Sequence, residues 1–302
     1  MRRRDTNMKF KHCMLVSLLA LAITPSLHAA ITVRDDAGNS VTLARPAQRV
    51  ISMAPHITEL LFAAGGGHVA GAMNFSDYPE AAKRLPLVGS DAQIDMERVL
   101  ALKPDLIVVW KSGNTARQLE QLKSLGIPIF YSEPQRLDDI ATSLTRLGQL
   151  LGSDAPAQAA AADYRRRIAA LAARYAQRPQ VRVFYQVWSK PLYTLNGEHI
   201  VNDAIRLCGG QNIFANLKVI APQVGTEAVL AENPEAVFGA ESHDAGDAGV
   251  YLWKQYSGLL ATKRGNLFAL AGEPLSRATP RMADGVAQLC EKIEIARQRR
   301  HE

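Results

Sequence analysis

Residues 97–108 read ERVLALKPDLIV, and residues 227–238 read EAVLAENPEAVF. Each stretch has a glutamate, then a Val-Leu-Ala run, then a proline, and finally an apolar segment. Proline lacks the backbone N–H that a continuing helix needs, and it disfavours the helical conformation in the residue before it. A short apolar segment after such a stop is typical of a buried strand. The chain therefore encodes the same helix–turn–strand unit twice.

Two other landmarks also recur. Arg-Val begins the first predicted strand of each half of the chain, at Arg49 and Arg182. Glu-Pro follows a later strand of each half, at residues 133–134 and 273–274. Three matched landmarks indicate two α/β lobes of like topology. Two lobes leave a cleft at their interface, and such clefts are preferred places for ligands.

The rest of the chain alternates between strand and helix patterns. We predict strands within 49–54, 68–73, 105–110, 127–132, 181–188, 235–238 and 266–272. We predict helices within 57–66, 96–103, 115–126, 137–152, 199–210, 226–232 and 280–300. This alternation favours parallel sheets with helices on their faces.

An alanine-rich stretch separates the two halves. Residues 153–179 contain no glycine, and a helix over 154–177 would be about 36 Å long at 1.5 Å per residue. We therefore predict an α/β protein of two Rossmann-like lobes with parallel sheets, joined by a single long α-helix. The lobes would span residues 31–152 and 180–302, with the connecting helix at 153–179.

Residues 1–30 form a separate segment. They have a basic start, an apolar run over residues 14–23, and small residues at Ala29 and Ala30, which is the pattern of a signal peptide cleaved near those alanines. The apolar run is too short for a permanent membrane anchor. Beyond residue 30 the chain carries 30 basic and 28 acidic side chains, so its charge gives no support for nucleic-acid binding.

Common catalytic motifs are missing from the sequence. GGGHVA (65–70) matches the letters of a dinucleotide-binding loop, but a helix precedes it and a strand follows, which is the reverse of the required order. The histidines beyond residue 30 have no metal-ligand spacing; they are His56, His68, His199, His243 and His301. We expect His56 to be a solvated loop residue and predict no metal site. A metal-dependent enzyme that uses the cleft is the weaker alternative.

Two cysteines, Cys208 and Cys290, lie beyond residue 30. In an exported protein an even number of cysteines favours a disulfide, although two buried thiols would also fit. A disulfide across so long a loop would contribute roughly 4 kcal/mol in the loop-entropy model.

Aromatic side chains fall where parallel sheets bind ligands. Trp110 and Trp188 end predicted strands in the two halves, and ligands gather beyond the carboxyl ends of such strands. We expect a flat apolar ligand between the lobes, with Glu273 and Arg277 as polar contacts. The alternative is that each aromatic side chain packs within its own lobe.

Several longer stretches resemble one known family. They are NFSDYP (74–79), MERVLALKPDLIVVW (96–110), GNTARQ (113–118), LCGGQNIF (207–214), PQVGTEAVLAENPEAV (222–237) and SRATPRMADGVAQLC (276–290). Over residues 49–292 the chain resembles the periplasmic cobalamin (vitamin B12)-binding proteins of ABC importers, in the helical-backbone (class III) group of substrate-binding proteins. The paired cysteines and the Arg-Ala-Thr-Pro-Arg segment favour cobalamin over the siderophores or haem that related receptors bind.

The resemblance implies a function without catalysis. A periplasmic receptor, monomeric when free, would carry cobalamin as its transported ligand and deliver it to a permease dimer with ATPase subunits; no cofactor is expected. A siderophore or haem receptor of the same fold is the alternative. The resemblance also implies the residues that line the corrinoid, which are Phe75, Trp110, Tyr193, Glu273 and Arg277.

The sequence departs mildly from the family at Glu273, where the resemblance leads us to expect an aspartate, and more strongly at two further positions. Asp91 and Ala221 stand where family members can carry tryptophan, and we expect Trp188 to replace part of that surface. The resemblance finally assigns Glu97 and Glu227, the first letters of the two repeats, to contacts with arginines of the permease. A two-fold partner needs two like contacts, and a duplicated lobe supplies them. The alternative is that each glutamate favours a helix N-terminus by its charge.

Overall fold

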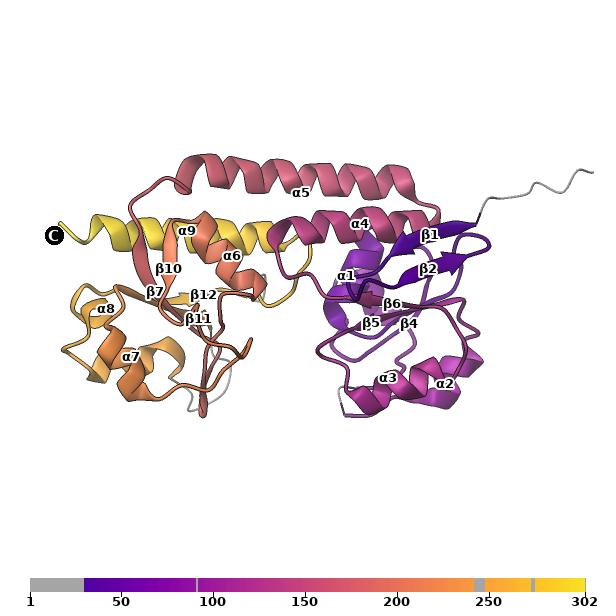
Figure 1. The fold of residues 1–302 in the computed structure, drawn as a ribbon, viewed down its shortest axis with the longest axis horizontal. Coiled ribbons are helices and arrows are strands. Elements are labelled where there is room, and N and C mark those ends of the chain that lie inside the picture. The colour runs from indigo at the N-terminus through magenta and orange to yellow at the C-terminus, as the bar shows by residue number, and fades with distance from the viewer. Residues whose placement is uncertain (1–29, 91, 242–247, 273–274, 302) are drawn as a thin grey trace, which may run out of the picture.

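The computed structural model describes residues 30–90, 92–241, 248–272 and 275–301. The predictions for the signal peptide up to residue 29, Asp91, His243 and Glu273 lie outside these residues. Two lobes lie side by side under one long helix, α5 (Asp154–Tyr175), as Figure 1 shows. Among the described residues, no helix combines the length and the apolarity that a membrane span requires.

Each lobe contains a four-stranded parallel sheet. In the N-terminal lobe the spatial order is β4–β3–β5–β6, and in the C-terminal lobe it is β10–β7–β11–β12. The first sheet consists of β3 (Val50–Ser52), β4 (Val69–Ala72), β5 (Leu106–Trp110) and β6 (Ile129–Ser132). The second consists of β7 (Val181–Gln186), β10 (Gly210–Asn212), β11 (Ala236–Ala240) and β12 (Leu267–Leu270). When the strands of each sheet are numbered by their order in the chain, both sheets have the spatial order second, first, third, fourth. The predicted duplication of the lobe is therefore confirmed.

Helices cover both faces of the sheets, and short antiparallel hairpins complete the lobes. The N-terminal lobe has α1 (Pro55–Ala63), η1 (Glu80–Arg84), α2 (Met96–Ala101), α3 (Ala116–Lys123), α4 (Leu137–Leu151) and the hairpin β1 (Ile31–Arg34)–β2 (Ser40–Leu43). The C-terminal lobe has α6 (Ile200–Leu207), α7 (Thr226–Glu232), η2 (Gly249–Gln255), α8 (Leu260–Lys263), α9 (Met282–Gln298) and the hairpin β8 (Trp188–Ser189)–β9 (Leu192–Tyr193).

The quoted repeat forms the same structure in both lobes. The residue before each proline, Lys103 or Asn233, has a positive φ of 47° or 46°, which turns the chain from helix to strand. The acidic residue after each proline then holds the first strand of its lobe. Asp105 Oδ1 accepts a hydrogen bond from the Arg49 N–H at 2.9 Å, and Glu235 Oε1 accepts one from the Arg182 N–H at 3.2 Å.

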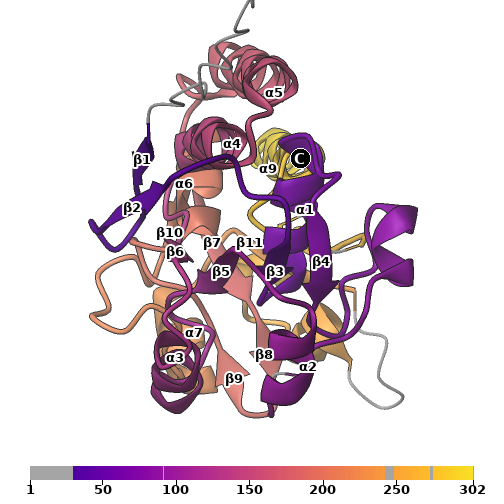
Figure 2. The ribbon, with the colours of Figure 1, turned by 90° about the vertical axis from the view of Figure 1, so that its right-hand side faces the viewer.

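The connecting helix is part of a helical layer. Helix α5 packs along α4 and α9, and the three helices lie on the same side of the two sheets (Figures 1 and 2). It begins at Asp154, as predicted, but ends at Tyr175, two residues before the predicted end. The prediction for the 181–188 strand was also too long, because β7 ends at Gln186 and Trp188 belongs to the separate hairpin β8–β9.

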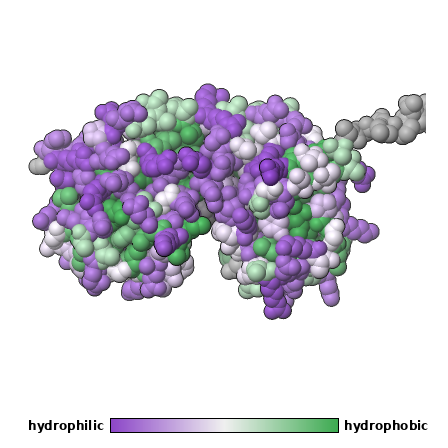
Figure 3. Space-filling view, in the orientation of Figure 1, coloured by the Kyte–Doolittle hydropathy of each residue, from purple (hydrophilic) through white to green (hydrophobic). Residues whose placement is uncertain are grey.

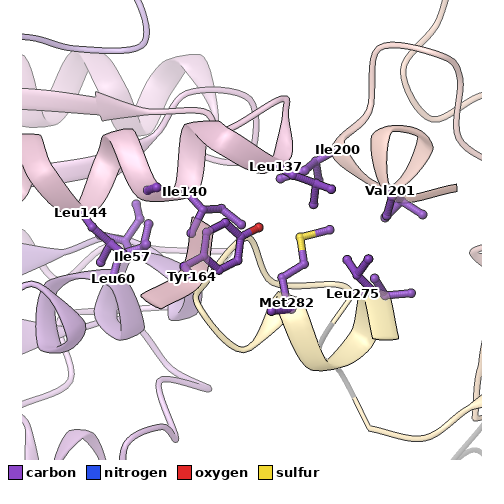
Figure 4. Packing of buried hydrophobic residues seen from close by; sticks show 14 of the residues in the cluster. Ile57, Leu60, Leu137, Ile140, Leu144, Tyr164, Ile200, Val201, Leu275 and Met282 are labelled. Carbon is purple, nitrogen blue, oxygen red and sulfur yellow. The ribbon is translucent and has the colours of Figure 1, made fainter. Parts of the chain in front are cut away.

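One hydrophobic cluster runs through both lobes. Leu137 and Ile140 of α4 and Tyr164 of α5 belong to the same buried cluster as Ile200 of α6 and Met282 of α9 (Figure 4). All five side chains are at most 6% exposed. The lobes are therefore joined by a continuous core as well as by the chain.

The predicted disulfide is confirmed. Cys208 is the C-terminal cap of α6 and Cys290 lies in α9, and the structure joins them with their Cα atoms 4.6 Å apart. The bond joins positions 82 residues apart in the sequence within the C-terminal lobe and fixes α6 against α9.

Candidate ligand cleft

A cavity of about 260 Å³ lies between the lobes. Its lining comes mainly from segments that follow β3, β5, β6 and β12 and from the segment before α6. The lining residues are Pro55, His56, Trp110, Glu133, Pro134, Gln135, Glu198, His199, Ile200, Ile220, Ser276, Arg277 and Ala278. The space-filling view shows a notch between the lobes on the side away from α5 (Figure 3). The cavity thus occupies the carboxyl ends of parallel strands, the usual ligand position in such sheets.

Trp110 is held at this edge by its local turn. It is the last residue of β5, its backbone N–H donates to Asn114 Oδ1 at 2.8 Å, and its side chain is 39% exposed. The indole also lies against Gly113, where an added Cβ would be 1.9 Å from the ring atom Cε3. The ring makes an edge contact with His56, with centroids 5.1 Å apart. A partly exposed, fixed indole is a suitable stacking surface for a flat ligand.

Arg277 enters the cavity from the C-terminal lobe and is held by the N-terminal lobe. Its Nη1 donates to Glu59 Oε1 at 3.0 Å and to Asp77 Oδ1 at 2.6 Å. Arg281 donates to both oxygens of Glu59, at 2.9 and 2.6 Å, and lies over the Tyr78 ring at 4.0 Å. Burial favours a higher pKa for Asp77, but the hydrogen bond and charge of Arg277 hold that pKa below its ordinary value. The same type of bond to Glu59 raises the pKa of Arg281.

Two histidines from opposite lobes line the cavity. His56 is 9% exposed at the start of α1, so the prediction of a solvated loop histidine was wrong. Burial, and then the charge of Arg277, lowers the pKa of His56 to about 4. Burial alone lowers the pKa of His199 to about 4, and its Nδ1 accepts a hydrogen bond from the Val201 N–H at 3.2 Å. Both rings are therefore neutral at pH 7.

The other predicted ligand-binding residues that the structure describes do not line this cavity. Phe75 is 73% exposed with a φ of 61°, a backbone conformation that is uncommon for a bulky side chain. Trp188 and Tyr193 are partners in the β8–β9 hairpin, and Trp188 is 58% exposed. Ala221 is exposed beside the lining residue Ile220. Three exposed or partly exposed aromatic residues thus remain outside the enclosed part of the cleft.

Glu59 is a site residue that sequence reasoning missed. It is the only charged residue in the apolar helix ITELLFAAGG (57–66), and a lone charge among buried residues needs a partner. That pattern could have indicated its role, although not the identity of its partners. Among the described residues, no group of three or more histidine, cysteine, aspartate or glutamate side chains is close enough to hold a metal ion.

The fold and the cleft define a class of protein. The profile of the periplasmic binding protein family matches residues 50–274, and the chain belongs to this family. Within it, the chain is 38% identical over 265 residues to the vitamin B12-binding protein of Vibrio parahaemolyticus, which covers 87% of this chain and 95% of that protein. It is 39% identical over 251 residues to the vitamin B12-binding protein of Yersinia pestis, covering 83% and 88% respectively.

Solved structures agree with this assignment. The periplasmic vitamin B12 binding protein BtuF of Vibrio cholerae superposes with a TM-score of 0.77 at 38% identity, covering 83% of this chain and 98% of that chain. A periplasmic heme binding protein from Pseudomonas aeruginosa superposes with a TM-score of 0.69 at 27% identity, covering 82% and 92%. The fold is shared between the two, while the sequence is more similar to the vitamin B12 binding protein.

Proposed function

We propose that this protein captures cobalamin in the cleft between its lobes and delivers it to the permease of an ABC importer in the periplasm. The observation that carries the proposal is the position of Trp110 and Arg277. The resemblance to cobalamin-binding proteins assigns both to the ligand, and both line one cavity formed by the two lobes. Residues 31–152 and 180–302 act as the two sides of the site, cobalamin is cargo, and the protein performs no catalysis.

The size of the cavity suggests how the ligand is held. Its volume of about 260 Å³ is below the range of roughly 300–1,000 Å³ that drug-sized ligands occupy. Cobalamin is larger than a typical drug, so part of the corrinoid lies in the open notch. Phe75, Trp188 and Tyr193 are the aromatic residues that contact this outer part. Glu273, in the segment before Arg277, supplies a further polar contact.

Native mass spectrometry provides the test of ligand identity. The purified protein is incubated with cyanocobalamin, haem and a ferric siderophore in separate samples and as a mixture. We expect a one-to-one complex of the monomer with cobalamin that persists in the mixture. Retention of haem or siderophore in preference to cobalamin would refute the proposed ligand.

N-terminal sequencing of the exported protein checks cleavage near Ala29 or Ala30.

We further propose that Glu97 and Glu227 dock the receptor on a permease dimer that works with ATPase subunits. Each is the second residue of its helix, α2 or α7, and each is exposed. Neither carboxylate forms an ion pair with a residue that the structure describes. Helices α2 and α7 both lie on the side away from α5, in different lobes (Figures 1 and 2). Matched carboxylates on either side of the notch fit a partner with two-fold symmetry.

A further inference from the structure

Glu59 is a buried carboxylate that joins the two lobes. Its side chain is 2% exposed, and it receives hydrogen bonds from Arg277 and Arg281. Helix α1, which carries Glu59, belongs to the N-terminal lobe, whereas both arginines lie between β12 and α9 of the C-terminal lobe. A buried charge is tolerated only where it is paired and hydrogen-bonded, so these contacts fix the positions of all three side chains.

Glu59 and Asp77 are two carboxylates that the structure places against the guanidinium groups of Arg277 and Arg281. Arg277 and Arg281 contribute two positive charges, while Glu59 and Asp77 contribute two negative charges within hydrogen-bond distance. The Arg277 side chain is 12% exposed, so its interactions are screened less by water than those of a surface pair. Removing the charge of Glu59 would deprive Arg277 and Arg281 of the carboxylate that both of them contact, and the repulsion between the two guanidinium groups would then move Arg277.

We propose that Glu59 and Asp77 are positioning residues that hold the Arg277 guanidinium at the wall of the ligand cavity before the ligand arrives. This inference rests on the proposed function, because it assigns to Arg277 a direct contact with cobalamin. A side chain that is already fixed loses little conformational freedom when the ligand binds, so the affinity is higher than it would be for a mobile arginine. Glu59 acts through Arg277 and does not touch the ligand itself.

Calorimetric titration with cyanocobalamin tests the proposal through a double-mutant cycle. Glu59→Gln should weaken binding by between about 2- and 12-fold, the effect of having to immobilise one flexible side chain on binding. The same substitution should change the affinity little when Arg277→Gln is already present, because the side chain it positions has been removed. A loss of equal size in both backgrounds would overturn the proposal, since it would mean that Glu59 supports the cleft independently of Arg277.

Two more variants separate positioning from stability. Asp284→Asn is the matched control, because it removes a carboxylate that pairs with Arg167 of α5 and does not line the cavity. It should leave the affinity unchanged. Asp77 is 57% exposed, so Asp77→Asn should fold even if Glu59→Gln does not. We expect Asp77→Asn to weaken binding in the same direction, and only when Arg277 is present; an unchanged affinity would contradict the proposal.

A measurement without ligand distinguishes this inference from the proposed function. Nitrogen-15 NMR of the ligand-free protein reports how fast the Arg277 guanidinium rotates. We expect slow rotation in the wild type and faster rotation in Glu59→Gln and Asp77→Asn. If the wild type fails to bind cobalamin, the proposed function is wrong, while the NMR result still decides whether the two carboxylates hold Arg277. Unchanged rotation in both variants would overturn the positioning role whatever the ligand is.

Discussion

Replacing Gly113 with alanine should displace the indole of Trp110, because the three atoms nearest to the added Cβ all belong to this ring. The added Cβ would lie 1.9, 2.2 and 2.3 Å from three atoms of the indole ring, whereas ordinary contacts begin at 3.4 Å. The indole must therefore move by about 1.5 Å or rotate away. Gly113 does not have a positive φ of the kind that disfavours alanine, so the effect of the substitution is steric and not conformational.

The expected loss of affinity follows from the area that the displaced ring no longer offers to the ligand. Removing the contribution of one large apolar side chain costs about 1–3 kcal/mol, which corresponds to roughly 5- to 150-fold in Kd. Trp110→Ala should show an effect of the same size. Because Trp110 is 39% exposed, the ring can swing towards solvent, and stability should fall by about 1 kcal/mol, the low end for overpacking.

Calorimetric titration with cobalamin gives the affinity, and tryptophan fluorescence of the free protein gives the position of the indole. Gly258→Ala is the matched control, since its added Cβ meets no atom within 4 Å. The control should resemble the wild type in both measurements. If Gly113→Ala changes the fluorescence but not the affinity, Trp110 does not contact the ligand. If it changes neither, the steric reasoning is wrong.

Three other predictions concern the connection between the lobes, the docking glutamates and the buried His56. Small-angle scattering should show almost the same radius of gyration with and without cobalamin, and a large decrease would contradict a rigid connection between the lobes. Glu97→Arg and Glu227→Arg should each weaken permease binding, and the double variant should weaken it more, while cobalamin binding stays intact. If docking is normal and the variants instead lose about 0.3–1 kcal/mol of stability, the glutamates act only at the helix N-termini. In the folded protein the pKa of His56 is lowered from its ordinary 6.5 to about 4. The stability that neutral His56 contributes is therefore fully present above pH 6.5 and is lost as the pH falls towards 4. Denaturant titrations should therefore show a shallower fall over this range for His56→Gln than for the wild type, and equal slopes would refute the assignment.

The duplicated lobes could be predicted because their signals are local. A helix stop, a proline and an apolar strand lie within twelve residues in each repeat, and the pattern of each depends on backbone sterics and burial. The same reasoning missed the hairpin of residues 31–43 and extended the 181–188 strand too far. The hairpin is held by Arg146 of α4, which pairs with Asp36, and such a distant contact leaves no local pattern.

The cleft was less predictable because its key contacts join distant parts of the chain. Trp110 and Arg277 were identified from strand ends and from the family resemblance. Glu59 was missed because the contact between its carboxylate and Arg277 spans 218 residues. His56 was assigned to solvent because its burial involves tertiary packing, including an edge contact with Trp110, 54 residues further along the chain. The spacing of residues along the sequence does not predict these tertiary contacts.

The continuous core that joins α4, α5, α6 and α9 also bears on the rate of uptake, because it limits movement between the lobes. If Glu97 and Glu227 dock the receptor as proposed and the lobes move little, the empty receptor presents the permease with nearly the same pair of carboxylates as the loaded receptor. Empty molecules then compete for the same docking site. Uptake would depend on the loaded fraction of the receptor population as well as on its abundance. Producing more receptor when the vitamin is scarce would consequently slow import, because unproductive encounters at the permease would become more frequent.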